Sequence, residues 1–227
     1  MNAQASATAA AVLPSGTAPE VTVVIPVYNE ERVLSQLFAR LYPALDRLGC
    51  RYECIFVDDG SADRSPALLR EQFARRPEHT RVIFLQSNFG QHAALLAGFK
   101  MARGQHLITL DADLQNPPEE ISRLLSKMAE GYDYVGTVRK RRQDSVWRRL
   151  ASRLMNQIRE RITRIRMTDQ GCMLRAYARP VVDAINSTRE INTFIPAMAY
   201  LYALHPSKSR SSTRNAAAAH PAIPCTG

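Results

Sequence analysis

The sequence predicts a single α/β domain built on a mostly parallel β-sheet flanked by helices. From residue 21 onward, short runs rich in β-branched residues alternate with amphipathic helical segments, which is the pattern of stacked βαβ units. Two of the apolar runs lead directly into paired carboxylates, at Asp58 and Asp59 and again at Asp111 and Asp113. The length of 227 residues fits one main domain with a sizeable core.

The expected strands and helices follow one another in a regular order. Each expected strand is a short apolar run, and in the first expected helix the apolar residues recur at intervals of three and four. The strands are expected at residues 21–27, 52–57, 81–85, 106–110 and 132–138. The helices are expected at residues 33–48, 65–76, 91–102 and 117–130.

Polar residues before two of these helices predict helix caps. Asn29 can cap the first helix, because a short polar side chain can accept a hydrogen bond from a free N–H of the first turn. In the run Asn116-Pro117-Pro118-Glu119, we expect Asn116 to be the N-cap and Glu119 to reach back as in a capping box.

The positive charge of the chain is concentrated in one segment. The formal net charge is +9, and residues 139–166 hold eleven Lys or Arg against two acidic residues, whereas the rest of the chain has nineteen of each. Residues 146–167 place Trp147 and six aliphatic residues at helical spacing with arginines between them, which predicts a basic amphipathic helix. Such a helix suits an anionic membrane surface, or equally a place on its own sheet with a solvated arginine face.

The two ends of the chain differ from its middle. Residues 1–20 are Ala-rich without the basic and apolar regions of a signal peptide, so we expect a disordered leader. Residues 205–227 lack a sustained apolar period and are expected to form an atypical, disordered tail, which leaves residues 21–204 as the domain. No apolar run approaches the roughly 20 residues that cross a bilayer. The spacing of the four cysteines suggests no disulfide framework and fits a reducing compartment.

Acidic residues after the second and fourth expected strands form the candidate site. The carboxyl ends of parallel strands line one crevice, so residues distant in sequence can meet there. Asp111 and Asp113 are two residues apart, and on an extended chain they offer hard oxygen ligands to Mg²⁺ or Mn²⁺, with Gln115 as a further oxygen donor. The alternative is that these acids only cap loops, because the DxD spacing alone is common.

Residues at the ends of the first two strands could contact a nucleotide. Asp58 or Asp59 could accept hydrogen bonds from a ribose hydroxyl or a base N–H. Tyr28 could stack on a base, and Glu30 could accept a hydrogen bond from it. Taken singly, each of these residue types is more often structural.

Four motifs in order resemble those of the GT-A glycosyltransferases of family 2. They are Val24-Ile25-Pro26-Val27-Tyr28-Asn29-Glu30, Val57-Asp58-Asp59-Gly60-Ser61, Asn88-Phe89-Gly90-Gln91 and Asp111-Ala112-Asp113-Leu114-Gln115-Asn116-Pro117-Pro118-Glu119. The likeness covers about residues 21–204 and is greatest to the polyprenyl-phosphate branch. That branch includes dolichyl-phosphate mannose synthases and bacterial undecaprenyl-phosphate transferases of lipid A modification, and the chain is more similar to the latter.

The resemblance implies a GT-A, Rossmann-like fold and an inverting transfer of a sugar from a nucleotide-diphosphate sugar, with a UDP-sugar favoured, to a polyprenyl phosphate. By position, the residues implied to contact the donor nucleotide are Pro26, Val27, Tyr28, Glu30, Asp58, Asp59 and Asp111. Those implied to hold Mg²⁺ or Mn²⁺ are Asp111, Asp113 and Gln115.

The resemblance also implies roles on the acceptor side. Asp113, Arg139 and Asp169 are implied as catalytic residues. Asp169 and Arg175 belong to residues 169–175, which resemble the family's segment under the acceptor site. The residues implied to face the acceptor phosphate or the membrane are Arg139, Arg148, Arg149 and Arg175. The implied location is peripheral, on the cytoplasmic face of the inner membrane, with an anionic membrane surface and no nucleic acid among the partners.

The end of the chain departs from the family pattern. Family members continue with a strand, a basic segment, interfacial helices and usually two membrane spans, and residues 205–227 do not resemble these parts. We therefore expect a C-terminal truncation or an altered reading frame. A chain of this kind could bind a nucleotide sugar without turning it over.

Two other classes of protein compete with a transferase. A response-regulator receiver also has an acidic pair after one strand and an Asp after another, but here the later Asp is doubled and no clear partner Thr and Lys follow it. A basic binding protein without chemistry could use residues 139–166 to hold an anion. Lipid is then preferred over nucleic acid, because Trp147 is the only aromatic residue available there for base stacking.

Overall fold

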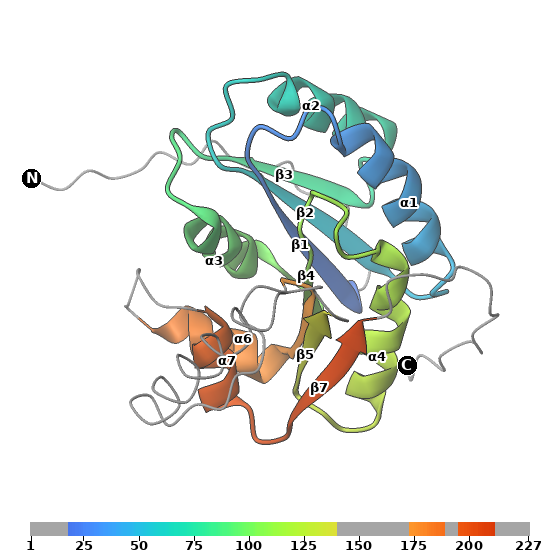
Figure 1. Cartoon of the computed structure of the whole chain (residues 1–227), viewed down its shortest axis with the longest axis vertical. Coiled ribbons are helices and arrows are strands. Elements are labelled where there is room, and N and C mark those ends of the chain that lie inside the picture. The colour runs from blue at the N-terminus through green and yellow to red at the C-terminus, as the bar shows by residue number, and fades with distance from the viewer. Residues whose placement is uncertain (1–17, 140–172, 189–194, 212–227) are drawn as a thin grey trace, which may run out of the picture.

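The computed structural model describes residues 18–139, 173–188 and 195–211. In these ranges the chain forms one seven-stranded sheet with helices on both faces (Figure 1). The strands are β1 (Val21–Val27), β2 (Tyr52–Asp58), β3 (Thr80–Phe84), β4 (His106–Thr109), β5 (Tyr134–Arg139), β6 (Arg175–Ala178) and β7 (Pro206–Ser211). They lie in the order β3-β2-β1-β4-β6-β5-β7, and only β6 runs antiparallel to its neighbours among the described strands. The predicted mostly parallel α/β fold is confirmed.

The helices pack on the sheet in two groups, which give the domain three layers. They are α1 (Leu34–Asp46), α2 (Ser65–Arg75), α3 (Gln91–Met101), η1 (Pro118–Glu120), α4 (Ile121–Ala129), α6 (Arg179–Ser187) and α7 (Ile195–Tyr202). Helices α1, α2 and α4 cover one face of the sheet, and α3, α6 and α7 cover the other (Figure 1). The sequence predicted the first four α-helices and the first five strands to within a few residues at each end.

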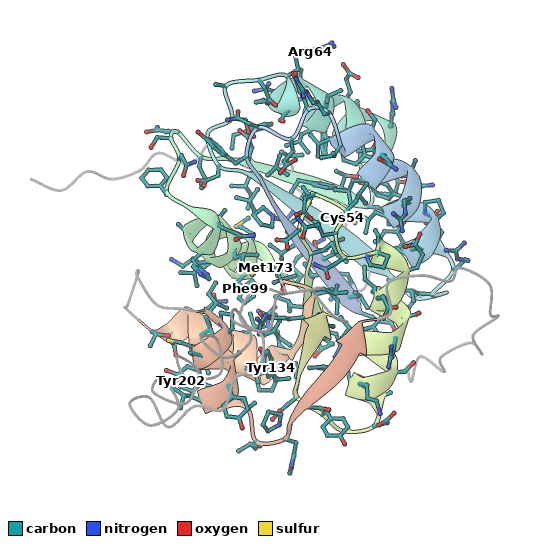
Figure 2. The ribbon with its side chains drawn as sticks, viewed as in Figure 1. Cys54, Arg64, Phe99, Tyr134, Met173 and Tyr202 are labelled. Carbon is teal, nitrogen blue, oxygen red and sulfur yellow. The ribbon has the colours of Figure 1, made fainter. Side chains whose placement is uncertain are left out.

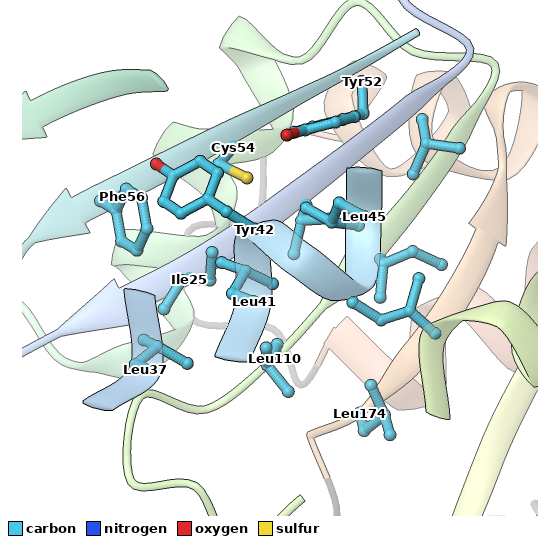
Figure 3. Close-up of a cluster of buried hydrophobic side chains, with 14 of the residues drawn as sticks. Ile25, Leu37, Leu41, Tyr42, Leu45, Tyr52, Cys54, Phe56, Leu110 and Leu174 are labelled. Atoms are coloured by element: carbon cyan, nitrogen blue, oxygen red, sulfur yellow. The ribbon is translucent and has the colours of Figure 1, made fainter. Parts of the chain in front are cut away.

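Each face of the sheet has its own apolar core, because successive strand residues point to opposite sides. Val23 and Ile25 of β1 pack against α1, whereas Val24 between them packs against α3. Figure 3 shows the first core, in which Leu37, Leu41 and Leu45 of α1 meet strand residues such as Ile25 and Phe56. Because both faces of the sheet are buried, the carboxyl ends of β1, β2 and β4 are held side by side at the same end of the strands.

Strand β7 corrects the prediction of a disordered tail from residue 205. Residues Pro206–Ser211 pair in parallel with β5, from Tyr134↔Pro206 to Arg139↔Ser211. The Asp133 carboxylate accepts hydrogen bonds from the N–H groups of Leu204 and His205 and guides the chain into this pairing. An edge strand is held by backbone hydrogen bonds and needs no apolar period, so the sequence pattern did not reveal it. Residues 212–227, most of the expected leader and the expected helix at 146–167 lie outside the described residues.

Both predicted helix caps are wrong. Helix α1 starts only at Leu34, and Asn29 has a positive φ of 56° and accepts a hydrogen bond from the N–H of Ala62 at 2.9 Å. The helix after the DxD motif begins with the 3₁₀ turn η1, without a side-chain cap. The Glu119 carboxylate binds the Arg40 guanidinium at 2.8 and 3.1 Å instead of reaching back to Asn116. Asn29 and Glu119 therefore both bind residues that are distant in sequence, and not the nearby helix N–H groups that the local sequence pattern predicted.

Among the glycines near the carboxyl ends of the strands, Gly60 is expected to tolerate substitution least. Its φ is +72°, and a Cβ atom there would lie 2.6 Å from the backbone carbonyl carbon of Ser87. Gly49 has a similar φ of +70° but open space around it. We expect Gly60→Ala to lower the free energy of unfolding by about 2–4 kcal/mol, from left-handed strain together with overpacking. Gly49→Ala should cost only about 1–2 kcal/mol from strain. Equal losses in urea denaturation of the two variants would contradict the close-packing argument.

Candidate functional site

A cavity of about 400 Å³ lies at the carboxyl ends of β1, β2 and β4. This volume falls within the range of small-molecule sites in proteins. Its walls come from the ends of β1, β2 and β4 with the loops that follow them, from the turn before α3 and the first residue of that helix, and from Met173 in the segment that leads into β6. Met173 is labelled in Figure 2. The lining residues are Pro26, Val27, Tyr28, Glu30, Asp59, Asn88, Gly90, Gln91, Asp111, Ala112, Asp113 and Met173.

The cavity brings together most of the residues predicted for nucleotide and metal binding. Of the seven predicted nucleotide contacts, all but Asp58 line it, and so do two of the three predicted metal ligands, Asp111 and Asp113. Gln115 is not among the lining residues. Five lining residues were not assigned a role from the sequence, namely Asn88, Gly90, Gln91, Ala112 and Met173. The motif Asn88-Phe89-Gly90-Gln91 was the available signal for three of them.

The loop that carries Tyr28 and Glu30 is fixed by the loop after β2. The N–H of Asn29 donates to the Ser61 hydroxyl at 2.9 Å, and the N–H of Glu30 donates to the Ser65 hydroxyl at 2.9 Å. These bonds join segments more than thirty residues apart. The Tyr28 side chain stays about half exposed. An exposed ring on a rigid loop is suited to stack on a planar ligand.

The two carboxylates after β2 have different surroundings. Both oxygens of Asp59 accept backbone hydrogen bonds, from the N–H of Phe89 and the N–H of Gly90, each at 2.9 Å. Asp58 is 3% exposed, and its Oδ2 accepts from the N–H of Ser61 at 3.3 Å. Its Oδ1 is buried without a hydrogen-bond partner in the described part of the chain. Burial raises the pKa of Asp58, because an ionised carboxylate loses solvation there.

Asp58→Asn is therefore expected to raise the melting temperature at neutral pH. An asparagine can still accept from the N–H of Ser61 and carries no charge to desolvate. A carboxyl whose folded pKa is raised loses stability as pH rises through that pKa, so the wild type is penalised at pH 7. We expect a gain of roughly 2–4 °C, the shift that about 1 kcal/mol gives in a chain of this size. The gain should shrink towards pH 4, as protonation removes the charge from the folded and then from the unfolded wild type. Calorimetry at pH 7, 5.5 and 4 measures it, and an undiminished gain at pH 4 would contradict the electrostatic cause.

The carboxylates after β4 lie where the chain turns. Asp111 Oδ1 accepts a hydrogen bond from the Gln91 side-chain amide at 2.7 Å, and Asp113 Oδ1 accepts from the N–H of Gln115 at 3.0 Å. Burial raises the pKa of Glu30, and the negative charges of Asp113 and Asp63 raise it further. Three of these acids, Glu30, Asp111 and Asp113, line the same cavity and make it electronegative.

The donor set fits a hard divalent cation in part. The described residues contain no cluster of three or more His, Cys, Asp or Glu side chains with the arrangement of a metal site. Two carboxylates on one wall supply the oxygen ligands that Mg²⁺ prefers, and this ion usually keeps several waters and takes further ligands from substrate phosphates. The residues thus suit a cation that binds together with a phosphorylated ligand.

In the described part of the chain, the structure does not place the residues predicted to face the acceptor at the cavity, unlike most of those predicted for the nucleotide. Arg175 lies in β6, is 1% exposed, donates a hydrogen bond to the Tyr134 hydroxyl and does not line the cavity. Arg139 ends β5, and its side chain lies outside the described part. Asp169, Arg148 and Arg149 also lie outside the described residues, so their roles stay predictions. None of the described helices is both long and apolar enough to cross a membrane.

Fold and site together define a GT-A-like α/β domain. Solved structures with this fold include Staphylococcus aureus TarS (residues 1–349) in complex with UDP-GlcNAc, with a TM-score of 0.58 at 18% identity over 87% of this chain and 60% of that one. They also include the mannosyltransferase PcManGT from Pyrobaculum calidifontis in complex with GDP-Man and Mn²⁺, with a TM-score of 0.59 at 16% identity over 89% of this chain and 58% of that one. At these identities the comparison establishes the fold.

The chain belongs to glycosyl transferase family 2, whose family model matches residues 22–185. It is 53% identical over 185 residues to the undecaprenyl-phosphate 4-deoxy-4-formamido-L-arabinose transferase of Pseudomonas aeruginosa (strain LESB58). That match covers 82% of this chain and 55% of the relative, so the chain spans about half the length of the curated relatives it matches. The predicted resemblance to this family, and to this branch of it, is confirmed.

Proposed function

We propose that the chain binds a UDP-sugar in the cavity and transfers the sugar to a polyprenyl phosphate at the cytoplasmic face of the inner membrane, in the manner of a lipid A modification enzyme. The observation that carries the proposal is the convergence of Tyr28, Glu30, Asp59, Asp111 and Asp113 on one cavity at the strand ends. The relatives' name, an undecaprenyl-phosphate sugar transferase, supports the acceptor class.

The donor end of the reaction follows from the residues on the cavity walls. Tyr28 would stack on the base, and the buried Asp58 would accept a hydrogen bond from a base N–H with its Oδ1. Asp111 and Asp113 would hold Mg²⁺ or Mn²⁺, and this cation supplies charge stabilisation for a leaving diphosphate. The acidic wall would otherwise repel a diphosphate, which is why a cation is expected to bind with the donor.

The acceptor end needs no general base. A phosphate monoester with a second pKa near ~6 is largely dianionic at neutral pH, so the nucleophile arrives deprotonated. The protein has to orient it and offset its charge. Arg139, at the end of β5, is the described position proposed for this role, and the basic residues after it are proposed to meet the anionic membrane surface.

A second candidate function is nucleotide-sugar binding without turnover. The observation that favours it is that the predicted residues lining the cavity are those for the nucleotide and the metal, whereas Arg175, predicted for the acceptor, lies buried in β6. A transfer assay with undecaprenyl phosphate in anionic vesicles separates the two functions, because a binding-only chain retains the UDP-sugar unchanged. The family assignment replaces the receiver-domain hypothesis.

Calorimetric titration with UDP and with GDP, each with and without Mn²⁺, tests the proposed donor site. We expect UDP to bind more tightly than GDP. We also expect Mn²⁺ to tighten UDP binding by about 10-fold or more, because the cation screens the acidic wall from the diphosphate. Failure of both nucleotides to bind in the presence of Mn²⁺ would refute the proposal. Equal UDP binding with and without Mn²⁺ would refute the proposed role of the metal in donor binding.

A further inference from the structure

The turn between β3 and α3 is clamped to the end of β2. Both oxygens of Asp59 are occupied by the N–H groups of Phe89 and Gly90, and the Asp59 N–H donates to the carbonyl of Val27 at 2.8 Å. Asp59 is 3% exposed although it lines the cavity. A carboxylate with two backbone donors and little exposure is poorly suited to hold a ribose, and well suited to shape a loop.

The clamped turn sets where α3 begins. Gly90 is the N-cap of α3 with a φ of +90°, and its N–H is shared between Asp59 and the Asn88 side chain at 2.9 and 3.0 Å. The first residue of the helix is Gln91. The position of the Gln91 side chain therefore depends on the turn that Asp59 holds.

Gln91 connects this turn to the other acidic strand end. Its side-chain amide donates to Asp111 Oδ1 at 2.7 Å, and both residues line the cavity. An amide donor fixes the orientation of a carboxylate without adding a charge that would cancel it. Asp111 can thus be held in one rotamer and remain negative.

We infer that Gln91 is a positioning residue for Asp111, and that Asp59 acts on the site through Gln91 by holding the turn at Asn88–Gly90. The inference rests on the proposed function in that Asp111 is taken to bind the cation with the donor. It reassigns Asp59, which the sequence suggested as a direct nucleotide contact. The Asp59 carboxylate would not touch the ligand.

Hydrogen exchange in the ligand-free full chain tests the structural half of the inference. In Asp59→Asn, one of the two backbone N–H groups faces an amide NH₂ instead of an oxygen. We expect the N–H groups of Phe89 and Gly90 and the side-chain amide of Gln91 to exchange faster by about 10-fold, the effect of losing one hydrogen bond to a charged group. Unchanged exchange of the Gln91 amide would overturn the inference, whatever the chain binds.

Asp133→Asn is the matched control. Asp133 also accepts two backbone N–H groups, that of Leu204 and that of His205, which lies 3.0 Å from both carboxylate oxygens, but it precedes β5 and does not line the cavity. Exchange at Phe89, Gly90 and Gln91 should be unchanged in this variant. Faster exchange there in Asp133→Asn would show a general loosening and would also overturn the assignment.

Calorimetry of UDP binding in a double-mutant cycle tests the functional half. Gln91→Ala should weaken UDP binding by about 10-fold with Mn²⁺ present and by less than about 2-fold without it. Asp59→Asn should weaken the Mn²⁺-dependent binding at least as much, and the double variant no more than Asp59→Asn alone, because both changes remove the same contact. Multiplicative losses, or equal losses without Mn²⁺, would overturn the inference. Absence of UDP binding by the wild type would instead refute the proposed function and leave the exchange result to decide.

Discussion

Asp113→Ala is expected to remove the Mn²⁺-dependent part of UDP binding and, in a chain that turns over, to abolish transfer. Asp113 lines the cavity with Asp111 and is close enough to Glu30 to raise the pKa of that carboxyl. Loss of a partner that only orients a metal ligand costs about 10- to 100-fold in metal affinity, so loss of a direct ligand should cost about 100-fold or more. Calorimetry with UDP and a Mn²⁺ series measures it.

Two further variants separate the charge of Asp113 from its role in the turn. Asp113→Asn keeps an oxygen that can accept the N–H of Gln115, so it should preserve the turn and still lose most of the metal dependence. Asp183→Ala removes an exposed carboxylate on α6 that pairs with Arg179 at 2.9 Å, and it should leave UDP binding unchanged. If Asp113→Ala binds UDP as tightly as the wild type with Mn²⁺, or if chelation leaves wild-type binding intact, the metal role fails.

The main elements of the fold could be predicted because their signals are local. Strand β1 was predicted at its observed bounds, and α1 to within two residues at each end. Burial on both faces leaves a continuous apolar run in a strand, and burial on one face leaves a periodic apolar stripe on a helix. Strand β7 left no such signal, because backbone pairing with β5 holds it at the edge of the sheet. The same limit explains Asn29, whose partner at Ala62 is brought near only by the folded loops.

For the candidate site, too, the features that follow from the sheet topology could be predicted, and those that depend on contacts between distant residues could not. That Asp59 and Asp111 share one cavity follows from the topology of parallel strands, which the sequence predicted. The difference between Asp58 and Asp59 could not be predicted, because neighbouring carboxylates in one motif meet the N–H of Ser61 in one case and the turn at Phe89 in the other. The burial of Arg175 in β6 was equally hidden, since an arginine in a basic chain is usually exposed.

One buried carboxylate, that of Glu53, holds the amino-terminal ends of the strands together, at the end of the sheet opposite the cavity. Glu53 in β2 is 1% exposed and accepts hydrogen bonds from the Thr22 hydroxyl at 2.8 Å and from the backbone N–H of Arg103 at 2.9 Å. Its other oxygen lies 3.0 Å from the Arg103 guanidinium and 3.4 Å from that of Arg81. Glu53 thereby joins β1, the start of β3 and the segment after α3.

Glu53→Ala is expected to lower the free energy of unfolding by about 3–5 kcal/mol, the cost of removing one partner from a buried ion pair. The loss arises because the mostly buried Arg81 guanidinium loses its carboxylate partner and keeps the neutral Met101 carbonyl, at 2.7 Å, while the Thr22 hydroxyl loses its acceptor. Glu119→Ala is the matched control, since its two bonds to Arg40 lie between side chains that are more than a third exposed, and it should cost about 1 kcal/mol or less. Urea denaturation followed by circular dichroism measures both. Because Glu53 lies at the edge of the sheet away from the cavity, the folded variant should still bind UDP normally, and similar losses for the two variants would contradict the role of burial.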